Sequence, residues 1–353
     1  MPIRLAANCV VCLPARLVNG LVGLALAILA SQAPLMHATA APATTPPASN
    51  KPIAPMPGIA TPLAFVPNEG AGTISVIDTT SDQVIDELPG GSKPRGLAVG
   101  PGRRWLYVSD QPNNLLQLVD LGVRRLGGTI SLGESPEGVS ISPDGRWVVA
   151  ALEGKNQIAV TDTRNNALAH AIEVHGKNPE HAVFSPNGKL LFVSAEEGDA
   201  VDIIDFASRK QVAQVAVGAR PRGIGFLPDS SRAYVATENA NEVFVIDGAS
   251  FAILARIKAG LRANGIAVHP NGREVYVSNG GDANVSVIDT ASNRVVATIP
   301  VGQRPWNMAL TPDGKKLYVA NGRSNTVSVI DTASRTKLRD IAVGKLPWGV
   351  VIR

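Results

Sequence analysis

The chain has 353 residues, of which 45% are hydrophobic, and its 33 basic and 29 acidic residues give a net charge of +4. About 290 of these residues in one closed fold would bury enough apolar surface to be stable without disulfides. No run of Lys and Arg is present, so the composition gives no support for binding nucleic acid through its phosphates.

Residues 1–40 have the order of features that is typical of a secretory signal peptide. Arg4 and Arg16 supply positive charge, an apolar run occupies residues 17–30, and Ala38-Thr39-Ala40 provides a cleavage signal. The apolar run has 14 residues, which is shorter than the ~20 needed to cross a bilayer. We therefore expect a periplasmic or secreted protein with no membrane span after cleavage.

Both cysteines lie in the predicted signal peptide, upstream of its apolar run. Cys9 and Cys12 would leave with this peptide, so the mature chain is expected to have no disulfide and no cysteine metal ligand. Residues 41–60 are rich in Pro, Ala and Thr and are predicted to be an extended linker. The folded domain is then expected to cover residues 61–353.

Two markers repeat through this domain at intervals of 42 residues, broken once by an interval of 43. A Val-Ile-Asp motif or a variant of it ends at Asp78, Asp120, Asp162, Asp205, Asp247, Asp289 and Asp331. A shared glycine recurs at Gly91, Gly133, Gly176, Gly218, Gly260, Gly302 and Gly344. A period of ~40–45 residues with strand-like content is typical of a β-propeller with one four-stranded blade per repeat. We therefore predict an all-β, seven-bladed propeller.

The repeat at residues 302–344 illustrates the pattern within a blade. Four β-rich segments alternate with turn signals, including Pro312-Asp313-Gly314 between two apolar runs. The aspartate after Val-Ile begins a turn and is expected to accept hydrogen bonds from backbone N–H groups two or three residues later. Because it occurs in all seven repeats, a structural role is predicted rather than a catalytic one.

The phase of the two ends predicts how the ring closes. The segment 347–352 matches only the innermost strand of a blade, whereas the domain begins at Ala64 with a second strand. One C-terminal strand and three N-terminal strands would together form a composite blade. Their pairing would remove the two exposed edges of an open array.

Tyr276-Val277-Ser278-Asn279 and Tyr318-Val319-Ala320-Asn321 resemble the YVTN family of β-propeller repeats, and the likeness covers residues 61–353. The C-terminal third, with Arg304-Pro305-Trp306-Asn307 and Pro347-Trp348-Gly349, is similar to periplasmic YVTN propellers associated with catabolism that depends on pyrroloquinoline quinone. This resemblance implies a partner such as a periplasmic quinoprotein dehydrogenase or its redox partner.

Residues that differ between repeats cluster after the shared glycine, where seven loops are expected to meet at one mouth of the central channel. We predict ligand or partner binding there, with arginines for a carboxylate or an acidic partner and tryptophans as apolar anchors. The opposing interpretation is that the arginines pair with Glu196 or Glu238 and that the tryptophans only plug the channel. The candidate residues are Arg95, His181, Arg220, Arg222, Arg262, Asn264, Arg304, Trp306, Asn307 and Trp348.

His181 replaces a glycine that five other repeats keep, and it lacks partners at metal-ligand spacing. No catalytic motif or phosphate loop is present, so we expect neither catalysis nor a metal or cofactor, with haem and calcium as alternatives.

The leading hypothesis is an exported, non-enzymatic binding propeller linked to quinoprotein-dependent oxidation in the periplasm, taking a protein partner or a small acidic ligand. The alternatives are a propeller enzyme, either lactonase-like or redox and haem-binding, with its site at the mouth, and a cell-envelope interaction protein with no metabolic role.

Overall fold

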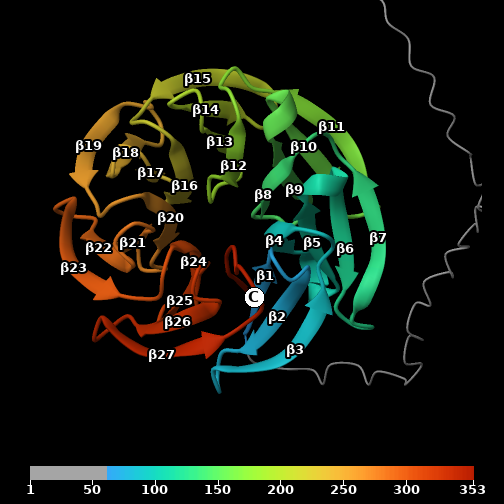
Figure 1. The fold of residues 1–353 in the computed structure, drawn as a ribbon. Helices are drawn as coiled ribbons and strands as arrows, with labels where there is room; N and C mark the ends of the chain where they lie inside the picture. The colour runs from blue at the N-terminus through green and yellow to red at the C-terminus, as the bar shows by residue number, and fades with distance from the viewer. Residues whose placement is uncertain (1–61) are drawn as a thin grey trace, which may run out of the picture. The chain divides into compact units, whose positions relative to one another are not determined.

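A computed structural model describes residues 62–353, which form seven four-stranded antiparallel sheets arranged as blades around a central channel (Figure 1). The predicted seven-bladed, all-β propeller is confirmed. The predicted signal peptide at 1–40 and the linker at 41–60 lie outside the described residues. Within residues 62–353, no helix is long and apolar enough to cross a membrane.

Each blade is a meander of four consecutive strands, from the channel outward, and six blades are continuous in sequence. Blade 1 contains β4 (Pro94–Val99), β5 (Trp105–Asp110), β6 (Leu115–Asp120) and β7 (Arg125–Ser131). Blade 2 contains β8 (Pro136–Ile141), β9 (Trp147–Leu152), β10 (Gln157–Asp162) and β11 (Ala167–Glu173). Blade 3 contains β12 (Pro179–Phe184), β13 (Leu190–Ala195), β14 (Ala200–Asp205) and β15 (Lys210–Ala216).

The remaining continuous blades follow the same order around the ring. Blade 4 contains β16 (Pro221–Phe226), β17 (Arg232–Thr237), β18 (Glu242–Asp247) and β19 (Ile253–Lys258). Blade 5 contains β20 (Ala263–Val268), β21 (Glu274–Asn279), β22 (Asn284–Asp289) and β23 (Arg294–Pro300). Blade 6 contains β24 (Pro305–Leu310), β25 (Lys316–Asn321), β26 (Thr326–Asp331) and β27 (Thr336–Ala342). Single 3₁₀ turns occupy η1 (Pro101–Arg103), η2 (Gln111–Asn113) and η3 (Glu153–Lys155).

Blade 7 is the composite blade that the ends of the sequence predict. It pairs β28 (Val351–Ile352) with β1 (Leu63–Asn68), followed by β2 (Thr73–Asp78) and β3 (Gln83–Pro89). The closing strand is shorter than the predicted segment 347–352, but a β-bridge between Asn68 and Pro347 continues the contact. The backbone N–H of Trp348 also donates to the carbonyl of Pro67 at 2.9 Å. The last residues of the chain therefore hold the first strand.

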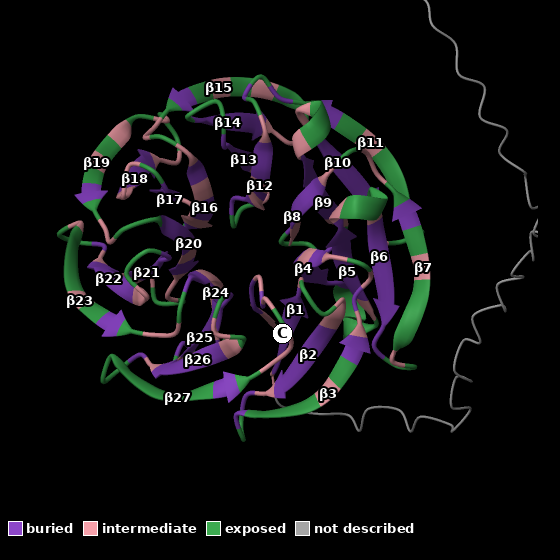
Figure 2. Ribbon diagram, in the orientation of Figure 1, coloured by how far each residue is buried: buried purple, intermediate pink, exposed green. Residues whose placement is uncertain are grey.

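Apolar side chains of neighbouring blades form the core. The middle strands are buried on both faces, whereas the outermost strands are mostly exposed to solvent, with one buried residue near the end of β23 (Figure 2). Four tyrosines on the second strands, Tyr107, Tyr234, Tyr276 and Tyr318, are completely buried. Such two-sided burial is what the β-branched and aromatic runs favour.

The repeated aspartates have the structural role that their turn position predicts. Each of the seven accepts a hydrogen bond from a backbone N–H two or three residues later, at 2.9 Å for Asp78 and 2.7 Å for Asp331. These bonds hold the turn between the third and fourth strands of each blade. The repeat signature therefore builds blades, and the residues that differ between repeats remain as candidates for function.

Candidate functional site

Two sets of loops lie side by side at one mouth of the channel and carry the variable residues. The first set follows the shared glycines, and the second follows the second strand of each blade. Backbone hydrogen bonds join them, as between Glu238 N and Arg220 O at 2.8 Å and between Gly322 N and Arg304 O at 3.0 Å. This pairing places a side chain from the second loop next to one from the first in each blade.

A bulge at the start of the inner strands turns their first residues toward the mouth. In blade 6 the register shifts between Pro305 and Met308, which frees Trp306 and Asn307 from regular pairing with β25. The same shift occurs in β4, β8, β16 and β20, and β12 has a smaller one. A bulge bends a strand and redirects its side chains, so the repeat itself positions the variable residues.

Two glycines make room for the bulky residues of blades 5 and 6. The position after the second strand is Glu or Gln in five repeats but is Gly280 and Gly322 in the other two. A Cβ on Gly280 would lie 2.6 Å from Arg304 Nη1, and one on Gly322 would lie 2.5 Å from the Trp306 ring. Arg304 and Trp306 thus occupy space that a side chain fills in the other repeats.

Together these residues enclose a cavity of about 320 Å³, which we call the mouth cavity. Its size is within the range of small-molecule sites, and its wall is mostly polar, with two indoles. The residues that line it are Glu69, Arg95, Gln111, Glu137, Glu153, Asn178, Glu180, Glu196, Arg220, Arg222, Asn264, Arg304, Trp306, Asn307 and Trp348.

Glu238 is a fully buried carboxylate that holds four arginines from three blades. Its Oε1 accepts hydrogen bonds from Arg262 Nε at 2.8 Å and from Arg304 Nη2 at 2.7 Å. Its Oε2 accepts one from Arg222 Nε at 2.8 Å and lies 3.4 Å from Arg220 Nε. Burial opposes its ionisation, but the charges of Arg222 and Arg304 outweigh burial and hold the pKa of Glu238 at about 2. We call these five residues the Glu238 cluster.

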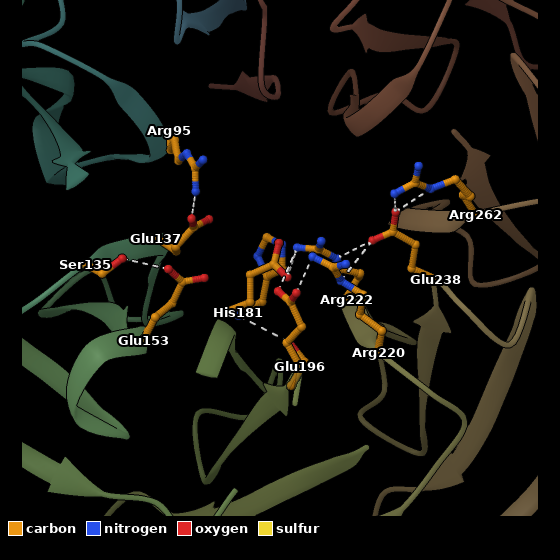
Figure 3. A network of polar contacts seen from close by, with 12 residues as sticks. Arg95, Ser135, Glu137, Glu153, His181, Glu196, Arg220, Arg222, Glu238 and Arg262 are labelled. Atoms are coloured by element: carbon orange, nitrogen blue, oxygen red, sulfur yellow. Dashed lines mark hydrogen bonds and ion pairs between the residues drawn. The ribbon is translucent and has the colours of Figure 1, made fainter. Parts of the chain in front are cut away.

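Blade 3 places two more carboxylates, Glu180 and Glu196, against the same arginines, and Figure 3 shows Glu196 beside Arg222 and Arg220. Arg222 forms ion pairs with both, at 3.0 Å from its Nη1 to Glu196 Oε2, and Arg220 pairs with Glu196. Burial, followed by the charge of Glu180, raises the pKa of Glu196 to about 7. The carboxyl group of Glu196 therefore exchanges a proton near neutral pH while remaining in contact with two arginines.

Trp348 reaches across the channel from blade 7 to blade 3, where it lies on His181. The two ring centres are 5.5 Å apart, and the ring planes are inclined at 35°. His181 Nε2 is buried, forms no hydrogen bond within residues 62–353 and lies 3.6 Å from Glu180 Oε1. Burial and then the charge of Arg222 lower the pKa of His181 to about 4, so the imidazole is neutral at physiological pH. Trp348 thus lines the mouth cavity and contacts the inner strand of blade 3.

Blade 2 contributes a separate acidic group on the other side of the mouth (Figure 3). Glu137 pairs with Arg95, whereas Glu153 accepts hydrogen bonds from Ser135 Oγ at 2.7 Å and Gln111 Nε2 at 3.1 Å. Both donors to Glu153 are neutral. Among residues 62–353, no basic side chain forms an ion pair with Glu153.

The structure brings eight of the ten predicted site residues to the wall of the mouth cavity. Arg262 lies outside this wall, in the Glu238 cluster, and His181 lies under Trp348. The arginines pair with Glu180, Glu196 and Glu238 instead of standing free, as the opposing interpretation predicted. Whether the mouth binds a ligand stays a prediction.

Gln111, Gly280 and Gly322 were missed as site residues, and the carboxylates of the mouth were not among the predicted site residues. Comparing the position after each second strand across the repeats would have found the two glycines, because they alone lack a side chain there. Within the described part of the chain, no group of three or more His, Cys, Asp or Glu side chains is arranged to hold a metal ion.

The family model for YNCE-like β-propellers matches residues 24–353. The chain belongs to this family. No curated protein matches the chain. The match extends over all seven blades, so the repeat signature and the composite blade belong to a family architecture.

Solved structures with the same fold include proteins of different kinds. Hydrazine synthase from Kuenenia stuttgartiensis is 26% identical, with a TM-score of 0.71 over 76% of this chain and 92% of that one. A 6-phosphogluconolactonase candidate from Bacteroides uniformis is 19% identical, with a TM-score of 0.70 over 83% and 99%. The dihydro-heme d1 dehydrogenase NirN is 16% identical, with a TM-score of 0.62 over 82% and 74%. The last two likenesses show the fold alone.

Proposed function

We propose that this protein is a non-enzymatic binding propeller, with the mouth cavity as its ligand or partner site. The observation that carries the proposal is a cavity of about 320 Å³ that Trp306 and Trp348 line together with fixed charged groups. Indoles offer large apolar contact, and charged groups held by their neighbours can recognise a ligand without reorganising.

The charged groups are held in place before any ligand arrives. Glu238 is fully buried and fixes Arg222 and Arg304 through hydrogen bonds of 2.8 Å and 2.7 Å. A rigid wall reduces the entropy lost on binding, which favours recognition of a defined shape. The paired arginines therefore support binding because their side chains are fixed in place, and not because they carry unpaired charges.

The test is to purify the protein from its own periplasm and to identify small molecules released from it by mass spectrometry. We expect wild type to release a compound that the Trp306→Ala, Trp348→Ala double variant lacks, with circular dichroism spectra that match. Trp306→Phe with Trp348→Phe is the control and should retain the compound. Equal release from wild type and the alanine variant would place any ligand elsewhere.

We propose in addition that the partner class is a periplasmic quinoprotein dehydrogenase or its redox partner. The support is the resemblance of the segments around Trp306 and Trp348 to propellers associated with pyrroloquinoline-quinone-dependent catabolism. Affinity capture from the periplasm of cells grown on an alcohol should enrich a quinoprotein with wild type but not with the double alanine variant. Enrichment that is the same with both proteins would contradict this assignment.

One observation favours an enzyme as a second candidate. The carboxyl group of Glu196 has a pKa of about 7 beside Arg220 and Arg222, which suits a general acid or base. Hydrolysis of 6-phosphogluconolactone by wild type, lost in Glu196→Gln, would favour this candidate. Turnover that is absent from both proteins, or equal in both, would argue against a catalytic role for Glu196 in that reaction.

A further inference from the structure

The charges of the mouth are divided between two opposite sides. Glu153 belongs to blade 2, whereas Arg262 and Arg304 belong to blades 5 and 6. In a ring of seven blades, blades 5 and 6 are each three steps from blade 2, which is as far across the channel as the ring allows. Figure 3 shows Glu153 and Arg262 at opposite edges of the view, with Arg222 and Glu196 between them.

The side formed by the Glu238 cluster has an excess of positive charge. Its four arginines face three carboxylates: those of Glu180, Glu196 and Glu238. Arg304 lines the mouth cavity, and only 9% of its side chain is exposed. Its Nη2 bonds to Glu238, but its Nη1 is buried and has no hydrogen-bond partner among the described residues. Because the four arginines exceed the three carboxylates by one charge and Arg304 lines the cavity, this side is suited to receive an anion.

The opposite side has a carboxylate, Glu153, that forms no ion pair with a basic side chain of residues 62–353. Glu153 lines the cavity, and its hydrogen-bond donors in this part of the chain are neutral groups, Ser135 Oγ at 2.7 Å and Gln111 Nε2 at 3.1 Å. These donors orient the carboxylate but leave its charge unbalanced. Glu69 and Glu137 on the same side share Arg95, and Glu69 also pairs with Lys93. Glu153 is therefore the group on this side that suits an ammonium or another cation.

Between the positively charged and the negatively charged side, one part of the cavity wall is apolar. Trp306 and Trp348 belong to blades 6 and 7, and both line the cavity. Arg304 lies over the Trp306 ring, with its central carbon 5.9 Å from the ring centre. A ring or hydrocarbon chain that joins two charged ends would contact these indoles.

We propose that the ligand is zwitterionic, with an anionic end at Arg304 and a cationic end at Glu153, joined by an apolar or aromatic segment against Trp306 and Trp348. This inference rests on the proposed function and specifies its ligand class. A ligand with two acidic groups would instead place its second negative charge next to Glu153, and the charge of Glu153 would stay unbalanced.

The test uses probes that share one ring and differ only in charge: 4-(aminomethyl)benzoate, 4-methylbenzoate, 4-methylbenzylamine and terephthalate. Their binding is followed through the tryptophan fluorescence of the whole protein. We expect the zwitterion to bind about 10-fold more tightly than either singly charged probe, because each end gains a charge-assisted hydrogen bond. Terephthalate should bind most weakly, because its second carboxylate faces Glu153.

Two variants test which residue binds each charged end of the ligand. Glu153→Gln keeps the shape and should reduce the affinity of the zwitterion to that of 4-methylbenzoate, whose own affinity stays unchanged. Arg304→Lys keeps a cation for Glu238 but removes the guanidinium group, and should weaken the three probes that carry a carboxylate while sparing 4-methylbenzylamine. If Arg304→Lys does not fold, Glu153→Gln alone decides the cationic end.

Equal or tighter binding of terephthalate or 4-methylbenzoate relative to the zwitterion would overturn the inference while leaving a binding site at the mouth. Binding of no probe at millimolar concentration would also overturn it. The proposed function is judged separately, by the compound released from the natively purified protein, so the two can fail independently.

Discussion

The hydroxyl group of Tyr318 donates a hydrogen bond to the carboxylate of Asp82, a residue 236 positions away in the sequence. Tyr318 belongs to blade 6 and Asp82 to the β2–β3 turn of blade 7, so this bond joins the last complete blade to the composite one. Lys316 Nζ contacts the same carboxylate at 2.9 Å. The ring is therefore closed by a buried polar contact as well as by strand pairing.

Removal of residues 347–353 should destabilise the whole propeller. The deletion takes away β28, the two bonds between Leu63 and Arg353 at 3.0 Å, and Trp348, and it exposes the edge of β1. Thermal unfolding should show a lower midpoint and a protein more prone to aggregate. An unchanged midpoint would mean that the contacts of Asp82 close the ring without the last strand.

Asp82→Ala should be destabilising even though every strand remains. Tyr318 and Lys316 would lose their shared acceptor in a site where the aspartate is 7% exposed, at a cost of about 3 kcal/mol in the free energy of unfolding. Urea denaturation of the variant measures this loss. Asp313→Ala, at an exposed hairpin, is the control and should cost far less.

Glu238→Gln should be one of the most destabilising isosteric changes in the mouth. An amide cannot neutralise Arg222 and Arg304, which would remain buried and mutually repelling, so we expect a loss of roughly 3–5 kcal/mol at pH 7. The contribution of Glu238 to the stability of the wild type should also disappear in acid, because the pKa of Glu238 is lowered from 4.5 to about 2. Wild type and variant should therefore converge in stability as the pH falls from 4.5 toward 2, and a constant difference would contradict this account.

Glu196→Gln should show the opposite dependence on pH. The pKa of Glu196 is raised in the fold from 4.5 to about 7, so the folded state retains a proton that the unfolded state has lost between these values. Wild type should lose stability relative to the variant as the pH rises from 4.5 to 7, by up to about 3 kcal/mol, and the difference should level off above pH 7. Denaturant titrations at several pH values would measure this slope. A difference in stability between wild type and variant that does not change from pH 4.5 to 7 would mean that Glu196 is ionised throughout this range.

Gly322→Ala should affect binding more than stability. The new methyl group would meet the Trp306 ring at 2.5 Å, and that ring lies at the cavity wall, where it can move toward the opening. Affinity for the zwitterionic probe should fall while the unfolding midpoint changes little. Gly128→Ala is the control, because the new methyl group would meet Leu118 Cδ1 at an ordinary 3.5 Å and would lie outside the mouth cavity.

We propose that the exported protein begins near Ala41 and carries neither cysteine. Mass spectrometry of the periplasmic fraction should give a mass that lacks residues 1–40. Detection of a peptide that contains Cys9 in that fraction would contradict the cleavage. The measurement is independent of all claims about the mouth cavity.

The seven-bladed architecture could be predicted from the residues alone, because the spacing of the repeats and the point at which the first and last repeats are cut can be read along the chain. The spacing of Asp78 to Asp331 predicted seven blades, and the mismatch between the first and last strands predicted the composite blade. The same comparison of repeats located the mouth, since Arg304, Trp306 and Trp348 stand where the repeats differ. Each of these inferences needs only the order of residues along the chain.

Only the tertiary structure decided how the mouth residues combine. Trp348 meets His181 across the channel, and Glu238 gathers Arg222 and Arg304 from different blades. Arg304 and Glu238 are 66 residues apart, and no spacing in the sequence specifies which charges pair and which stay unbalanced. The physical reason is that closing the ring places residues from distant repeats around one axis. Their burial and partners, and therefore their charge states, are set by that closure rather than by their sequence neighbours.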